Sequence, residues 1–275
     1  MPQDARTLGN LSVQLAAQGR WREALEAAHA CLDLAEPGSV LYLWALHMLA
    51  CTYVDAGMPH RARPYALAYL SQAAGNPQLG PYTPYVVRAM GHIAYRERRF
   101  AAAMVWLLRA ERLFVARGDR EQAERTAITL AWVLIRLRQP EAALQALSRH
   151  RSESTPEHLR QGALSAIAYL QGRYEEAIAL GRQALDGQSR FAHDLVDAAE
   201  VSLVIAHALR AIGAMDEASA YVERAAHLAA LQGWETVVLL LLNHGAGGGD
   251  PSDSAADARG SANLRHRGCF CTGVA

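Results

Sequence analysis

Histidine side chains are the first candidates for chemistry in this sequence, because imidazole can act as an acid, a base or a metal ligand near neutral pH. His47, His92 and His207 fall on corresponding faces of three predicted helices. Cys51, one helical turn after His47, is the one partner at hydrogen-bonding spacing from any of them. A His–Cys pair lacks the third, orienting group that nucleophilic catalysis normally uses. We therefore expect no catalytic residues and no enzyme activity.

Cofactor and metal motifs are also missing from the sequence. It has no phosphate-cradling glycine loop, no HExxH and no GxSxG motif. Near its end, His266, Cys269 and Cys271 could ligate a soft metal, but one Cys-x-Cys supplies too few ligands for a closed tetrahedral site. We expect no cofactor and no metal site.

Arginine and aromatic residues accompany the three histidines on the same helix faces, and this combination favours binding. Arginine offers a planar fork to carboxylates, and aromatic rings offer rigid contact area. Together they suit an extended or helical peptide with an acidic side chain or a free C-terminus. In the alternative, the rings only pack between helices while the arginines extend to water. The candidate peptide-binding residues are Trp44, His47, Tyr85, Arg88, His92, Tyr95, Arg96, Arg125, Trp132, Arg136, Tyr169, His207 and Arg210.

A turn phrase that recurs about every forty residues defines the elements that must position these side chains. An apolar helix ends, a short polar turn follows, and an alanine-centred second helix begins. Because each such hairpin buries its apolar face only by stacking on its neighbours, the recurrence predicts an α-solenoid. The six copies are Gly19–Ala24, Gly57–Ala62, Arg98–Ala103, Arg138–Ala143, Gly172–Ala177 and Gly213–Ala218.

The residue types within each predicted hairpin agree with this division. The first helices carry apolar residues at helical spacing, such as Leu8, Leu11 and Leu15. Pro64 falls several residues into the second helix of the second hairpin, so we predict a late start or a kink there. Four glycines occupy turns that favour a positive φ: Gly19, Gly57, Gly172 and Gly213.

The small residue, the alanine five positions on and the second alanine seven further on resemble the tetratricopeptide repeat family. Gly91, Ala103 and Ala110 are the clearest set, and the resemblance covers residues 5 to 243. It implies an all-α, right-handed superhelical solenoid of about six hairpins, with the first helices lining a concave wall. The long repeat is similar to sensor solenoids of bacterial transcription regulators and peptide-pheromone receptors. Family members that clamp a C-terminal carboxylate use lysines, which this sequence lacks.

The C-terminal part of the chain departs from the repeat. Residues 234 to 243 resemble the first helix of an incomplete seventh hairpin, which places the solenoid at residues 1–244. The apolar run from Val237 to Leu242 indicates either that a partner covers this helix or that the ancestral solenoid continued, and one hypothesis for the partner is a second copy of the chain in a homo-oligomer. Residues 245–275 are rich in Gly, Ser and Asp, so we expect a disordered tail.

The charge balance restricts the class of partner. The chain has 27 basic residues, all arginine, and 27 acidic residues. This balance disfavours direct nucleic-acid binding. The start of the chain lacks the layout of a secretory signal, and no apolar run is long enough to cross a membrane. We expect a cytoplasmic protein that does not bind membranes.

Two functional hypotheses follow from these observations. The first is a non-catalytic scaffold or sensor that holds an acidic peptide or protein segment along its concave groove. Arg88, Arg96 and Arg136 would supply the charge. The second is an effector or oligomerisation module of a bacterial transcription regulator whose DNA-binding segment lies outside this chain.

Overall fold

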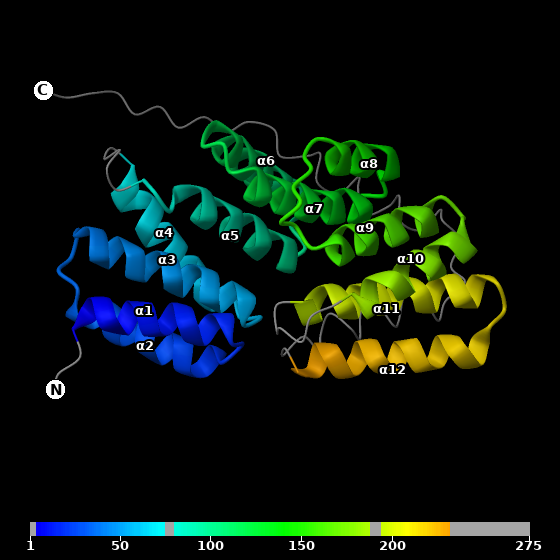
Figure 1. Cartoon of the computed structure of the whole chain (residues 1–275), viewed down its shortest axis with the longest axis horizontal. Coiled ribbons are helices and arrows are strands. Elements are labelled where there is room, and N and C mark those ends of the chain that lie inside the picture. The colour runs from blue at the N-terminus through cyan, green and yellow to red at the C-terminus, as the bar shows by residue number, and fades with distance from the viewer. Residues whose placement is uncertain (1–3, 75–79, 188–193, 232–275) are drawn as a thin grey trace, which may run out of the picture. The chain divides into compact units, whose positions relative to one another are not determined.

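Twelve α-helices, arranged as six consecutive hairpins, make up the described part of the computed structural model (Figure 1). The structure describes residues 4–74, 80–187 and 194–231. The helices are α1 (Ala5–Ala17), α2 (Trp21–Leu34), α3 (Val40–Asp55), α4 (Pro59–Ala73), α5 (Thr83–Arg96), α6 (Phe100–Ala116), α7 (Arg120–Arg136), α8 (Pro140–Ser148), α9 (Glu157–Leu170), α10 (Tyr174–Asp186), α11 (Asp194–Ala211) and α12 (Met215–Leu231).

The first helices of successive hairpins form one continuous layer. Each of α1, α3, α5, α7 and α9 contacts the next first helix, ending at α11, and each of the six contacts its own hairpin partner. The second helices α2, α4, α6, α8 and α10 pack against both the helix before and the helix after them in the chain, and α12 packs against α11. The helices α3, α5, α7, α9 and α11, which carry the candidate binding residues, are therefore neighbours in one layer.

The turns inside the hairpins share one backbone solution. After each first helix comes a residue with positive φ. The N–H of the next residue donates to the carbonyl five positions before it, as in Arg20 N to Leu15 O at 3.0 Å. This is the Schellman motif, which satisfies the last carbonyls of a helix. Glycine fills four of the turns as predicted, and Arg98 (φ 59°) and Arg138 (φ 58°) fill the other two.

Small residues lie where the helices of a hairpin cross. Ala103 and Ala110 are fully buried. A Cβ placed on Gly91 would lie 2.7 Å from Cγ and Cδ2 of Leu107 on α6. The predicted set of small residues thus allows the close approach of α5 and α6.

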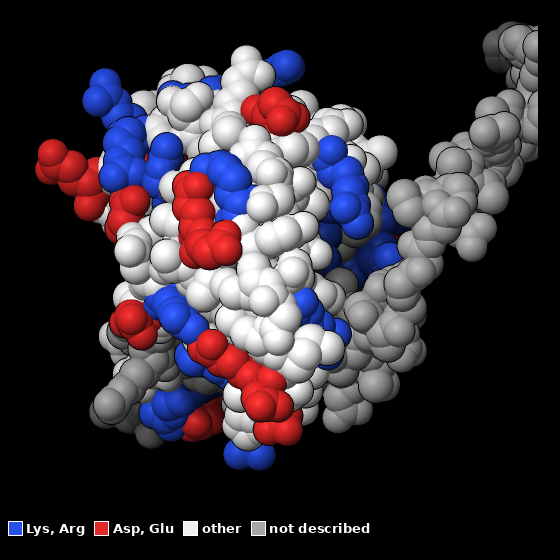
Figure 2. Space-filling model, turned by 90° about the vertical axis from the view of Figure 1, so that its right-hand side faces the viewer, with Lys and Arg blue, Asp and Glu red and all other residues white. Residues whose placement is uncertain are grey.

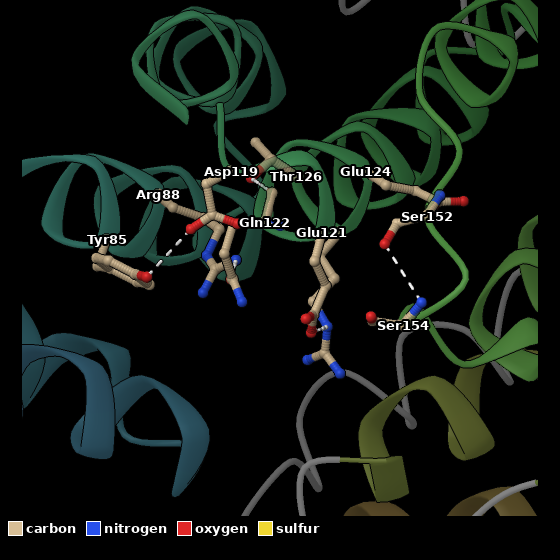
Figure 3. Close-up of polar contacts among 10 residues, drawn as sticks. Tyr85, Arg88, Asp119, Glu121, Gln122, Glu124, Thr126, Ser152 and Ser154 are labelled. Atoms are coloured by element: carbon tan, nitrogen blue, oxygen red, sulfur yellow. Dashed lines mark hydrogen bonds and ion pairs between the residues drawn. The ribbon is translucent and has the colours of Figure 1, made fainter. Parts of the chain in front are cut away.

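The fourth hairpin is irregular because α8 is short. Its chain leaves the helix at Ser148, and two buried glutamates hold the segment that follows. Glu111 Oε1 lies 2.9 Å from Arg149 Nε and 2.8 Å from His150 Nε2. Glu124, which lies on α7, accepts a 2.6 Å hydrogen bond from the backbone N–H of Ser152 (Figure 3 labels both residues). These carboxylates thus connect the segment after α8 to α6 and α7.

One of the two alternatives predicted at Pro64 is wrong. The helix containing Pro64 does not start late, since α4 begins at Pro59 and continues through Pro64. Pro64 removes the N–H that would bond the His60 carbonyl, and His60 is exposed, so water can satisfy that carbonyl.

The remaining C-terminal predictions fall outside the described residues. These are the seventh helix with its run from Val237 to Leu242, the boundary at residue 244 and the tail. The described helices belong to one compact unit, Met1–Val238. Within the described ranges, none of the helices combines the length and the apolar character needed to cross a membrane.

Candidate binding cavity

A cavity of ≈ 200 Å³ lies on the first-helix layer. Helices α3, α5, α7, α9 and α11 all contribute to its wall. Its lining residues are Cys51, Val54, Asp55, Tyr85, Arg88, Ala89, His92, Tyr95, Arg96, Arg125, Ile128, Thr129, Trp132, Leu159 and Glu200. One face of α5 supplies much of the polar lining, because Arg88, His92 and Arg96 are each one helical turn apart.

The structure brings together the central part of the sequence-predicted set. The members that line the cavity are Tyr85, Arg88, His92, Tyr95, Arg96, Arg125 and Trp132. The basic and aromatic character expected for the middle of the groove is therefore concentrated around one cavity, on α5 and α7.

The two candidates on α3 lie elsewhere. Trp44 packs against α1, where its ring occupies the space that a Cβ on Gly9 would need. His47 stacks on Tyr82 with ring centroids 4.7 Å apart and meets the edge of Tyr85 at 5.7 Å. Both rings make the interhelical contacts that the alternative interpretation of the sequence described.

The candidates on α9 and α11 form a separate group. Tyr169 and His207 have ring centroids 6.0 Å apart, and Tyr174 lies 5.9 Å from Tyr169. Burial lowers the pKa of His207, and Arg210, one turn further along α11, lowers it further. None of these side chains is part of the cavity lining.

Arg88 is held in place by neutral partners (Figure 3). Its Nη1 donates a 2.6 Å hydrogen bond to Gln122 Oε1. Its guanidinium carbon lies 5.4 Å from the centroid of the Phe114 ring and 5.6 Å from that of Tyr85. Tyr85 in turn donates to Asp119 Oδ2 at 3.4 Å. Burial lowers the pKa of Arg88, and the nearby Asp55 opposes that shift.

The cavity's histidine and cysteine are unsuited to nucleophilic chemistry. Burial, with Arg88 and Arg96 beside it, lowers the pKa of His92 to about 3. Burial also raises the pKa of the Cys51 thiol to about 12. Near neutral pH the thiol is therefore protonated, and the thiolate that would act as a nucleophile is scarce. The described residues contain no group of three or more His, Cys, Asp or Glu side chains arranged to hold a metal ion.

A polar bridge crosses the first-helix layer at one side of the cavity. Tyr95 on α5 donates to both carboxylate oxygens of Glu200 on α11, at 2.8 and 2.9 Å. Arg136 Nη2 on α7 lies 3.2 Å from Glu200 Oε1, and Arg136 Nε donates to the Tyr95 hydroxyl at 3.3 Å. The Glu200 side chain is 7% exposed. Arg136 is thus paired with an internal carboxylate.

Asp55 and Glu200 share the predicted inner face with the selected residues, but only basic, histidine and aromatic side chains were selected as binding residues, and Thr129 was missed. Asp55, Thr129 and Glu200 all line the cavity. Helical spacing places Asp55 one turn after Cys51, and it could have found Thr129, which lies one turn after Arg125. Glu200 is different, because its contact with Tyr95 joins two hairpins far apart in the chain.

Positive and negative side chains are interspersed on the face of the molecule that Figure 2 shows. On the face in Figure 2, arginines lie beside acidic side chains, with no large area of one sign. Exposed ion pairs such as Arg182 with Glu217 and Arg151 with Glu157 belong to this pattern. Such pairs contribute little stability individually.

Comparison with known proteins supports the fold. No protein-family model and no curated protein matches the sequence. Among solved structures, the chain is similar to PilF, a tetratricopeptide-repeat protein, from a functional characterization of Pseudomonas aeruginosa PilF. The TM-score is 0.50 and the identity 16%, over 82% of this chain and 91% of that chain. At this identity the likeness shows the fold alone. The predicted class, an α-solenoid of tetratricopeptide-like hairpins, is confirmed.

Proposed function

From this solenoid fold and its basic cavity, we propose that the chain is a non-catalytic binding protein that holds an acidic peptide or protein segment on its first-helix layer. The observation that carries the proposal is the convergence of Arg88, Arg96 and Arg125 on one cavity wall in a chain of balanced charge. Guanidinium groups from two helices can grip one carboxylate from two directions. Tyr85 and Trp132 add aromatic contact area.

The test is partner capture with a charge-reversal variant. The wild-type chain and the triple variant Arg88→Glu, Arg96→Glu, Arg125→Glu are used as baits, and captured proteins are identified by mass spectrometry. Arg136 is left unchanged, because it is paired with Glu200. We expect at least one partner to be retained by the wild type and lost from the variant.

A matched control separates the cavity from general charge. The variant Arg112→Glu, Arg120→Glu, Arg224→Glu makes the same change in net charge at exposed positions outside the cavity. Circular dichroism confirms that each bait is folded. Loss of the partner from both variants, or from neither, would refute binding at the cavity.

The remaining parts of the proposal can be tested in the same experiment and one other. A captured protein with a helix-turn-helix segment would support the second hypothesis, that the chain is the effector module of a bacterial transcription regulator. We propose a cytoplasmic location and no direct nucleic-acid or membrane partner, supported by the balanced charge. Self-association through Val237 to Leu242 predicts a concentration-dependent mass that Leu239→Glu with Leu241→Glu abolishes.

A further inference from the structure

The size and position of the cavity limit what can enter it. Its volume is ≈ 200 Å³, whereas sites for drug-sized ligands usually span about 300–1,000 Å³. A dry cavity of about 150 Å³ can hold benzene. The bridge from Tyr95 to Glu200 also joins α5 to α11 directly at one side. A peptide main chain could not pass along the layer there without breaking that bridge, so the cavity suits a compact group.

The wall presents arginines and one buried hydrogen-bond donor to which the described residues offer no acceptor. Trp132 is 5% exposed, and its indole Nε1, which can only donate, has no hydrogen-bond partner within the described ranges. The buried Nε of Arg125 lies 3.3 Å from Glu121 Oε1, in an ion pair outside hydrogen-bond geometry. Arg88 donates its hydrogen bond to a neutral amide, that of Gln122. Buried donors of this kind require an acceptor.

We infer that the cavity is a pocket for one carboxylate on a compact, partly apolar body about the size of benzoate. Arginine forks from α5 and α7 match a planar carboxylate, and the rings of Tyr85 and Trp132 contact the apolar part. The inference deepens the proposed function, because the carboxylate can be a partner's side chain inserted into the pocket. A free small carboxylate has the same chemistry.

Benzoate and benzamide test the pocket, since they share a ring and a planar head group but differ in charge. Binding to the full chain is measured by isothermal titration calorimetry at fixed ionic strength. We expect benzoate to bind and benzamide to bind at least tenfold more weakly. Equal binding of the two, or no binding of benzoate, would overturn the inference.

Two variants assign the binding to the named donors. Arg125→Gln should weaken benzoate binding at least tenfold, and Trp132→Phe, which keeps the aromatic ring and removes the N–H, should weaken it a few-fold. Arg112→Gln, an exposed arginine on α6, is the control and should leave binding unchanged. Benzoate affinity that is the same in Arg125→Gln as in the wild type would place the site elsewhere and overturn the inference.

A competition experiment distinguishes the two sources of the carboxylate. If excess benzoate releases the partner captured by the wild-type chain, the pocket takes a side chain of that partner. If benzoate binds and the partner is retained, the pocket takes a free small carboxylate. Failure to capture any partner would count against the proposed function and leave the benzoate result standing, so the two failures are distinguishable.

Discussion

Two arginines occupy the backbone conformation that glycine holds in the other hairpin turns. Arg98 and Arg138 have φ of 59° and 58°. In this left-handed region an L side chain costs about 1–2 kcal/mol, because Cβ approaches the following carbonyl oxygen. Both residues keep the Schellman bonds of the motif, such as Gln139 N to Leu134 O at 2.9 Å. The motif is thus retained although its preferred residue is not.

Arg138→Gly should stabilise the protein. Relief of the strain is partly offset by the greater entropy of glycine in the unfolded chain, so we expect a gain of about 0.5–1 kcal/mol in the free energy of unfolding. Urea denaturation followed by circular dichroism measures it. Gly172→Ala, at the equivalent turn with φ 75°, should destabilise by about 1 kcal/mol. A loss of stability in Arg138→Gly would mean that the arginine side chain contributes more than the strain costs.

Glu200→Gln should destabilise the protein more strongly. The substitution leaves Arg136, whose side chain is 26% exposed, without its charge partner, and breaking a buried pair typically costs about 3–5 kcal/mol. Tyr95→Phe removes one hydroxyl from the same bridge and should cost about 1 kcal/mol. Thermal and urea unfolding of both variants provide the comparison. Equal stabilities of Glu200→Gln and the wild type would show that the bridge is not maintained in solution.

The helices and their crossings were largely predictable from sequence, because the same constraint recurs in every hairpin. Small residues such as Gly91 and Ala103 mark the crossings, and turn residues mark the ends of the first helices. The short α8 was not predictable. Its end depends on Glu111 and Glu124, which reach the following segment from other helices and carry no local signal.

Gly91→Ala tests the crossing of α5 and α6. The added methyl group would lie 2.7 Å from the Leu107 side chain, so one helix must shift. We expect a loss of about 1–3 kcal/mol in the free energy of unfolding. In the Leu107→Ala background the same change should cost much less, because the space is then open, and this coupling is the measured quantity. Additive effects of the two substitutions would contradict the predicted contact.

At the scale of the whole molecule, the candidate site was predictable in part. The stripe Arg88, His92 and Arg96 followed from helical spacing alone. The pairing of Arg136 with Glu200 did not follow from helical spacing. It depends on how much each hairpin is rotated relative to the previous one, since those rotations bring Glu200 on α11 close to Tyr95 on α5. The total rotation is the accumulated result of many small packing angles, which residue spacing along one helix does not encode.

Acid should destabilise the fold through its buried histidines. Burial and neighbouring arginines lower the pKa of His92 to about 3, and burial with Arg88 lowers that of His47 to about 4. In the unfolded chain both titrate near 6.5, so below that pH the unfolded state binds more protons. The free energy of unfolding should fall from about pH 6.5 downwards, by up to about 1.4 kcal/mol per pH unit for each histidine.

Urea denaturation at a series of pH values measures this dependence. His92→Asn should give a shallower fall between pH 6 and 4 than the wild type. Parallel curves for wild type and His92→Asn would show that His92 is protonated in the folded protein as readily as in the unfolded one.

The bridge between Tyr95 and Glu200 has a consequence for how the array comes apart. Hairpins linked only to their neighbours can fray one at a time from either end. This bridge joins residues 105 positions apart, in the third and sixth hairpins. Fraying of the sixth hairpin therefore breaks a buried contact with the third. In native-state hydrogen exchange, hairpins three to six should open as one cooperative block, while the first two open at lower free energy.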